Sequence, residues 1–188
     1  MLKRLVLSGL ALCCVAGTAL AATVADVEVP DTASVGGKIL PLNGAGLREI
    51  FWVDVYVGGL YVEKPSHDPG ELLTETGPNR VLMHFVHDAP SKKVIKAWNE
   101  GFEDNNSGEV VKQLKPRIDA FNALFGTDLK DGDVVLLDYV PGAGTQVRIN
   151  GVLKGTVPGE DFNQALLRIW LGPNPPSDNI KEGMLGTD

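Results

Sequence analysis

The residue with the clearest chemical potential is Arg48, which enters a segment, residues 46–63, that is rich in β-branched and aromatic side chains. Arginine is rarely buried without a partner, because an uncompensated guanidinium in the interior costs several kcal/mol. Two interpretations follow. In the first, Arg48 is a surface or edge charge, or it pairs with Asp54 on the same strand face. In the second, its planar fork binds a carboxylate through two hydrogen bonds. Spacing alone favours the surface charge or the ion pair.

Other residue patterns that support catalysis or metal binding are weak in this sequence. His84 and His87 stand three apart on an expected strand, so their side chains point to opposite faces, and no nearby carboxylate completes a set of metal ligands. Gly142-Ala143-Gly144 lies between two expected strands and is typical of a hairpin turn, not of a phosphate-binding loop. No nucleophile elbow is present. We therefore expect neither a metal ion nor a cofactor.

Large aromatic residues recur at helical spacing in the second half of the chain. They follow the period of an apolar helix face and are Trp98, Phe102, Phe121, Phe125 and Trp170. Their simplest role is core packing, but they could equally line an apolar pocket between helices and a sheet. The sequence leaves both roles open.

The elements that must position these residues alternate between strand-like and helix-like stretches. β-Branched and alternating segments predict strands at residues 26–30, 38–42, 80–86, 133–140, 145–150 and 152–157, and a strand pair within 46–63. Asn150-Gly151 favours a tight hairpin, and Gly58-Gly59 indicates a bulge or a close backbone approach. Amphipathic spacing predicts helices at 92–105, 108–125 and 160–171, a helical turn near 69–75, and a short helix at 178–185.

This order of elements favours an α+β fold in which helices pack on one face of a largely antiparallel sheet. No repeat or internal linker interrupts the pattern. Ser177 or Asp178 is expected to cap the short final helix, directly after a proline-rich bend. We expect a single domain.

The first residues have the plan of a secretory signal peptide. A basic start, Met1 to Arg4, precedes an apolar run at 5–16 and an Ala19-Leu20-Ala21 cleavage site. The run is too short to span ~30 Å of hydrocarbon comfortably, and neither Cys13 nor Cys14 follows the small residue that lipid attachment requires. We expect residues 1–21 to be removed, residues 22–188 to form the domain, and the mature protein to be periplasmic without a stable membrane anchor.

Composition limits the partners of such a domain. The 188 residues include 17 basic and 24 acidic ones, a net charge of −7, and 44% are hydrophobic, which is ample for a core. Without Lys3 and Arg4 the balance becomes 15 against 24, or −9, and both cysteines are lost with the leader. Thiol chemistry and disulfides are then excluded, and the acidic surface argues against nucleic acid as a partner.

Several segments resemble the chalcone isomerase-like family. Residues 43–48 (NGAGLR) and 55–62 (VYVGGLYV) look like its opening strands. Residues 169–177 (IWLGPNPPS), followed by 180–186, resemble its closing motif. The two ends have the expected order and separation, so the resemblance covers nearly all of residues 26–186, and it is to the bacterial exported branch more than to the plant enzymes.

The resemblance implies an open-faced β-sandwich of the chalcone isomerase type, with helices closing a ligand cleft over a large antiparallel sheet. In the active enzymes an Arg steadies the attacking phenolate, and a Thr, a Tyr and an Asn complete the site. Arg48 matches that Arg, and Tyr56 falls at the Thr position. Pro90 and Ala97 occupy the Tyr and Asn positions, and Ser177 matches a closing Ser/Thr. The catalytic set is therefore incomplete.

An Arg with a Tyr at the Thr position resembles the family's non-catalytic fatty-acid-binding members, in which the two side chains hold a carboxylate. This resemblance implies that Arg48 and Tyr56, with Ser177, bind a fatty acid or similar apolar carboxylate. Two alternatives stay open: an isomerase or lyase acting on a small phenolic, chalcone-like substrate, and a structural or partner-binding envelope protein. The sequence leaves the oligomeric state open.

Overall fold

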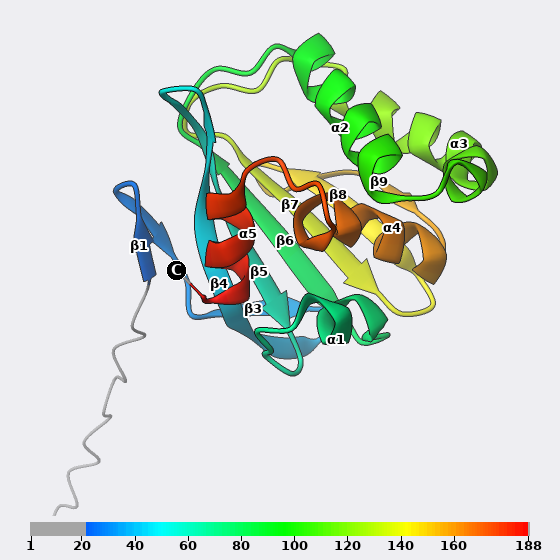
Figure 1. The fold of residues 1–188 in the computed structure, drawn as a ribbon, viewed down its shortest axis with the longest axis horizontal. Coiled ribbons are helices and arrows are strands. Elements are labelled where there is room, and N and C mark those ends of the chain that lie inside the picture. Colours follow the sequence, from blue (N-terminus) through cyan, green and yellow to red (C-terminus); the bar gives the residue numbers. More distant parts are fainter. Residues whose placement is uncertain (1–21, 188) are drawn as a thin grey trace, which may run out of the picture.

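A computed structural model describes residues 22–187 of the chain, and the expected signal peptide lies outside these described residues. The fold is built around a seven-stranded antiparallel sheet. Each strand pairs with its neighbours in the sequence, in the order β3 to β9 (Figure 1). The strands are β3 (Thr32–Val35), β4 (Lys38–Ile50), β5 (Val53–Val62), β6 (Asn79–Phe85), β7 (Val134–Val140), β8 (Gly144–Ile149) and β9 (Val152–Val157). A separate hairpin joins β1 (Ala22–Val24) to β2 (Val27–Val29).

The helices cover one face of this sheet, and the β1–β2 hairpin lies on the other side (Figure 1). They are α1 (Pro69–Thr74), α2 (Ser91–Asn105), α3 (Gly108–Asn122) with the 3₁₀ turn η1 (Ala123–Phe125), α4 (Glu160–Leu171) and α5 (Asp178–Leu185). The main core lies between helices and sheet, and a smaller one lies under the β1–β2 hairpin. The predicted α+β fold with helices on one face of an antiparallel sheet is confirmed.

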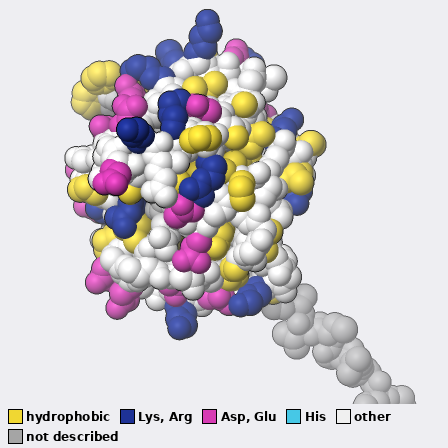
Figure 2. Space-filling view, turned by 90° about the vertical axis from the view of Figure 1, so that its right-hand side faces the viewer, with side chains coloured by type: hydrophobic (Ala, Val, Ile, Leu, Met, Phe, Trp, Pro, Cys, Tyr) yellow, Lys and Arg dark blue, Asp and Glu magenta, His cyan; other side chains and the backbone are white. Residues whose placement is uncertain are grey.

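Alternation along the strands separates the two cores. In β5, Tyr56 and Leu60 belong to the helix-side core, whereas Val57 and Tyr61 belong to the smaller one. This is the period-2 pattern expected of a strand that is buried on both faces. On the side of the molecule over α3 and α4, basic and acidic side chains are interspersed, with hydrophobic ones between them (Figure 2).

Helix α5 lies unusually close to the sheet because glycines stand on both sides of the contact. A Cβ atom on Gly46 of β4 would be 2.7 Å from the backbone oxygen of Asn179 and 2.9 Å from Cα of Ile180. A Cβ on Gly58 of β5 would lie 2.7 Å from Met184 Cε. Of the two expectations for Gly58-Gly59, the close approach is correct, since the pairing of β5 with both neighbours is regular at these residues.

Two bulges interrupt the pairing of β4 with β5, and both lie away from Gly58 and Gly59. The first leaves Asn43 unpaired, and its side chain donates to the carbonyl oxygens of Met184, at 2.7 Å, and Ser66, at 3.1 Å. The second follows the pair Arg48–Tyr56 and leaves Val55 without a partner on β4. A bulge bends the strand and re-aims nearby side chains.

Two strand predictions were incomplete. Residues 32–35 form β3, although Gly36 and Gly37 made this region resemble a turn. The expected strand at 38–42 continues through Asn43 and the following glycines to Ile50. The close approach of α5 requires residues without side chains at these glycines. Within residues 22–187, no helix has the length and apolar character needed to cross a membrane.

Candidate functional site

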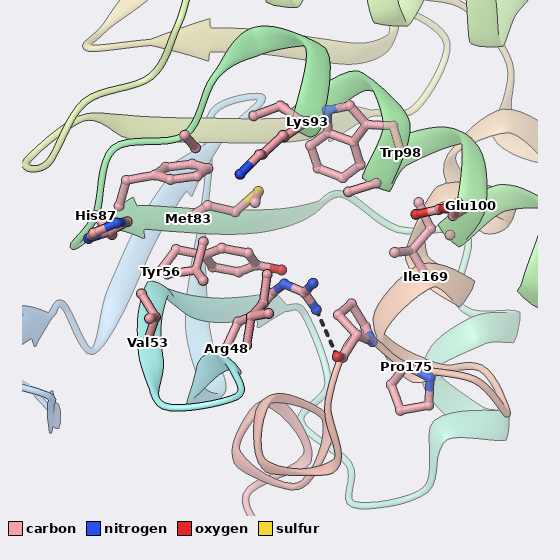
Figure 3. Close-up of a pocket in the computed structure, with 18 of the residues that line it drawn as sticks. Arg48, Val53, Tyr56, Met83, His87, Lys93, Trp98, Glu100, Ile169 and Pro175 are labelled. Carbon is pink, nitrogen blue, oxygen red and sulfur yellow. Dashed lines mark hydrogen bonds between the residues drawn. The ribbon is translucent and has the colours of Figure 1, made fainter.

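Arg48 lies near the end of β4, directly opposite Tyr56 of β5. It is half-buried, and its Nη1 donates a hydrogen bond to the carbonyl oxygen of Pro176 at 2.7 Å (Figure 3). Its other N–H groups have no acceptor among the residues that the structure describes. The contact with Pro176 therefore orients the guanidinium and leaves part of its donor fork available.

The alternative ion pair between Arg48 and Asp54 does not form among the described residues. It assumed that both residues share one face of a continuous strand. Instead, the chain turns at Phe51-Trp52, and Asp54 lies on the returning strand opposite Glu49. The turn contains no glycine, proline or asparagine, so no residue typical of a turn marks its position in the sequence.

Tyr56 is held firmly in the helix-side core. It is buried, its ring lies 5.4 Å from the ring of Phe85, and its hydroxyl oxygen accepts a hydrogen bond from Trp170 Nε1 at 2.9 Å. Its own proton meets no acceptor among residues 22–187. A hydroxyl both accepts and donates, so the bond from Trp170 leaves the donor capacity of Tyr56 unused among the described residues.

Burial raises the pKa of Tyr56, while the positive charge of Arg48 and the hydrogen bond from Trp170 act in the opposite direction. Desolvation disfavours the phenolate, which is the charged form. Because the pKa lies above its usual value near 10, the hydroxyl keeps its proton throughout the physiological range. Tyr56 is thus a neutral hydrogen-bond donor beside a permanent cation.

Both residues line a pocket of about 630 Å³ between the sheet and α2. Its volume is typical of small-molecule sites, which range over ~300–1,000 Å³. The apolar part of the lining comes from the strands, α2 and α4, and includes Val55, Met83, Phe85, Val94, Trp98 and Ile169. Trp98 and Ile169 therefore serve as core residues and as pocket wall, so the two roles left open for the aromatic residues coexist at Trp98.

Charged residues lie on the pocket's other walls. Lys93 of α2 extends toward the sheet, and Glu100 lies farther along the helix, near Ile169 (Figure 3). Lys93 takes part in no ion pair with another described residue. His87 also lines the pocket, whereas no group of three or more His, Cys, Asp or Glu within residues 22–187 is arranged to hold a metal ion.

The structure separates Ser177 from the other two predicted site residues. Its hydroxyl oxygen accepts a hydrogen bond from the backbone N–H of Ile180 at 3.4 Å and so caps the N-terminus of α5. Ser177 does not line the pocket, although Pro175 and Pro176 directly before it do. Its observed contact therefore supports the helix that follows the pocket wall.

Two features of the site escaped sequence analysis. The hydrogen bond from Trp170 to Tyr56 joins residues 114 positions apart, and the bond from Arg48 to Pro176 joins residues 128 apart. The proline-rich stretch at 173–176 indicated a bend, but no local pattern shows which strand a bend contacts.

Pro90 and Ala97, at the positions of the enzymes' Tyr and Asn, also line the pocket and carry no side-chain hydrogen-bond donor.

Comparison with known proteins identifies a family and similar solved structures. The chalcone isomerase-like family matches residues 21–186. A crystal structure of an Arabidopsis thaliana fatty-acid binding protein matches with a TM-score of 0.67 at 17% sequence identity, covering 88% of this chain and 96% of that one. No curated protein matches the sequence significantly. At this level of identity, the likeness to the plant protein shows a common fold.

Proposed function

Because the chain belongs to the chalcone isomerase-like family, we propose that it binds a fatty acid or similar apolar carboxylate between sheet and helices. The observation that carries the proposal is the placement of Arg48 and Tyr56 as cross-strand neighbours in an apolar pocket. The likeness in fold to a plant fatty-acid binding protein supports it.

The carboxylate would take charge-assisted hydrogen bonds from the free N–H groups of Arg48 and a further bond from the Tyr56 hydroxyl. Such bonds are shorter and stronger than those between neutral groups. The raised pKa of Tyr56 favours this role, because the hydroxyl donates only while it is protonated. Arg48 remains charged at any physiological pH.

The hydrocarbon chain would occupy the space between α2 and the sheet. Each methylene removed from water contributes about 0.8 kcal/mol. Val55, Met83 and Phe85 offer this chain an apolar surface beside Arg48 and Tyr56. We propose that no isomerisation takes place, since Pro90 and Ala97 provide no donor to polarise a ketone.

Fatty-acid binding is tested by titrating the purified protein with palmitate, 1-hexadecanol and hexanoate, and by native mass spectrometry of the protein as isolated. We expect palmitate to bind most tightly, since hexadecanol lacks the carboxylate and hexanoate lacks most of the chain. Equal affinity for palmitate and hexadecanol would contradict the role of Arg48. Turnover of a chalcone, followed by its absorbance, would instead favour the enzyme.

We also propose that the protein is exported to the periplasm and that residues 1–21 are removed. The basic start, the apolar run and the Ala19-Leu20-Ala21 site support this proposal. N-terminal sequencing of the protein from a periplasmic fraction is expected to begin at Ala22. Recovery of a chain that still starts at Met1 would refute it.

A further inference from the structure

The tip of the β4–β5 hairpin exposes four consecutive hydrophobic residues, Ile50 to Val53, which we call the apolar tip. Phe51 and Trp52 are 91% and 95% exposed, and Ile50 and Val53 are each 43% exposed. Scattered exposed hydrophobic residues are ordinary, but a contiguous apolar patch marks an interaction site. The side chains of Phe51 and Trp52 contribute almost nothing to either core.

The conformation of the turn does not explain these residues either. Ile50 pairs with Val53, so Phe51 and Trp52 form a two-residue turn, and Phe51 has a φ of +57°. A bulky residue is disfavoured at positive φ, where glycine or asparagine is the usual choice. Within residues 22–187, the other two-residue turns place Ala25-Asp26, Gly36-Gly37 and Asn150-Gly151 at positive φ, and none of these residues is bulky or aromatic. Phe51 therefore occupies a strained turn position while its side chain faces solvent.

The apolar tip also borders the entrance to the proposed ligand site. All four of its residues line the same pocket as Arg48 and Tyr56. A long-chain fatty acid dissolves poorly in water and partitions into lipid bilayers, so a protein that collects it gains from contact with a bilayer at the pocket mouth. This step rests on the proposed function, whereas the exposure of the tip does not.

We propose that the apolar tip inserts into the interface of a phospholipid bilayer and opens the pocket toward the lipid. Trp is enriched at membrane interfaces, and Trp and Phe supply the apolar faces of segments that lie there. A protruding two-residue turn fits a deformable lipid layer, which needs no preformed groove. The tip itself carries no charge, so entering the headgroup region desolvates no ionised side chain.

Charges around the apolar tip favour a neutral membrane over an anionic one. Glu49 and Asp54 face each other directly at its base. Lys93, His87 and Asp88 line the same pocket; Lys93 forms no ion pair with another described residue, and Asp88 is already paired with Lys130 at 3.0 Å. The whole chain is acidic, with a net charge of −7. We therefore expect binding to phosphatidylcholine vesicles that is not strengthened by anionic lipid.

The test is co-sedimentation with phosphatidylcholine vesicles in the absence of fatty acid, together with tryptophan fluorescence. The chain has three tryptophans, and Trp98 and Trp170 are only 4% and 1% exposed, so a vesicle-induced blue shift reports on Trp52. We expect the wild-type protein to sediment with vesicles and to show the shift. Trp52→Phe should still sediment but lose the shift.

The decisive variant combines Phe51→Gly with Trp52→Ser, and we expect it to bind vesicles at least tenfold more weakly. Glycine suits the positive φ of position 51, so the unfolding temperature should not fall. The matched control is Ile39→Ser, because Ile39 is 68% exposed at the opposite end of the same strand and should leave binding unchanged. If the double variant fails to fold, the test is made with Trp52→Ser alone, which is also expected to bind vesicles more weakly than the wild type.

Absence of vesicle binding by the wild type, or equal binding by the tip variant, would overturn the proposal. A wild-type dimer that the tip variant converts to a monomer, without vesicle binding, would assign the tip to self-association instead. The test of membrane binding can be distinguished from the test of the proposed fatty-acid binding. Vesicle binding without palmitate binding would refute only the ligand, and palmitate binding without vesicle binding would refute only the membrane contact.

Discussion

Replacing Arg48 with methionine is expected to weaken palmitate binding by roughly ten- to a hundredfold. A hydrogen bond to a charged group contributes about 1.5–3 kcal/mol, and each 1.4 kcal/mol corresponds to a factor of about ten in the dissociation constant. Methionine keeps the apolar length of the side chain and removes only the donors. Isothermal titration with palmitate measures the loss, and affinity for 1-hexadecanol should change little.

Arg148→Met is the matched control for this variant. Arg148 is also half-buried on a strand, and its guanidinium donates to Gln146 at 3.3 Å, but it does not line the pocket. We expect its palmitate affinity to equal that of the wild type. If Arg48→Met bound palmitate as tightly as Arg148→Met, the carboxylate would not be held at Arg48. Thermal unfolding of both variants separates a binding defect from the loss of the bond to Pro176.

Introducing a single methyl group at Gly46 is expected to destabilise the protein at the contact between the sheet and α5. The Cβ of Gly46→Ala would meet backbone atoms of Asn179 and Ile180, which cannot rotate away as a flexible side chain would. Overpacking of this kind costs about 1–3 kcal/mol. For a chain of this size that lowers the unfolding temperature by roughly 2–12 °C, as measured by calorimetry.

The displaced element in Gly46→Ala would be α5, so hydrogen exchange should rise there before it rises in the central strands. Palmitate binding should also weaken, because α5 follows directly on the segment that carries Pro176. Gly108→Ala is the control, since no atom lies within 4 Å of a Cβ at that position and its φ is not positive. An unfolding temperature for Gly46→Ala equal to that of Gly108→Ala would show that α5 accommodates the methyl group.

Much of the fold could be predicted because its elements have regular local patterns. The helices at 92–105 and 160–171 lie within one residue of α2 and α4, since each combines helical apolar spacing with clear ends. Strand β3 was missed because four residues beside a Gly-Gly pair give too short a signal. The glycines within β4 make room for α5, and contacts between distant segments leave no periodic pattern in the sequence of either segment.

Part of the candidate site could also be predicted from the sequence. Arg48 is conspicuous on its own, because a cation on an apolar strand requires an explanation. Its pairing with Tyr56 depends on where the chain turns, and the aromatic pair Phe51-Trp52 hides that turn. Of the two expected caps of the final helix, Ser177 and Asp178, the structure shows Ser177 in that role. The pocket itself depends on how far α2 stands from the sheet, which only the assembled structure reveals.

The tight contact of α5 with β4 also sets an order of assembly. The strands pair in a simple sequential meander, so most of the sheet can form while the chain is still emerging from a ribosome or a translocation channel. Pro176, which anchors Arg48, and Trp170, which anchors Tyr56, arrive only with the last twenty residues. An incomplete chain can therefore form most of the sheet but lacks the two contacts that hold Arg48 and Tyr56, so the binding that we propose would require the complete chain.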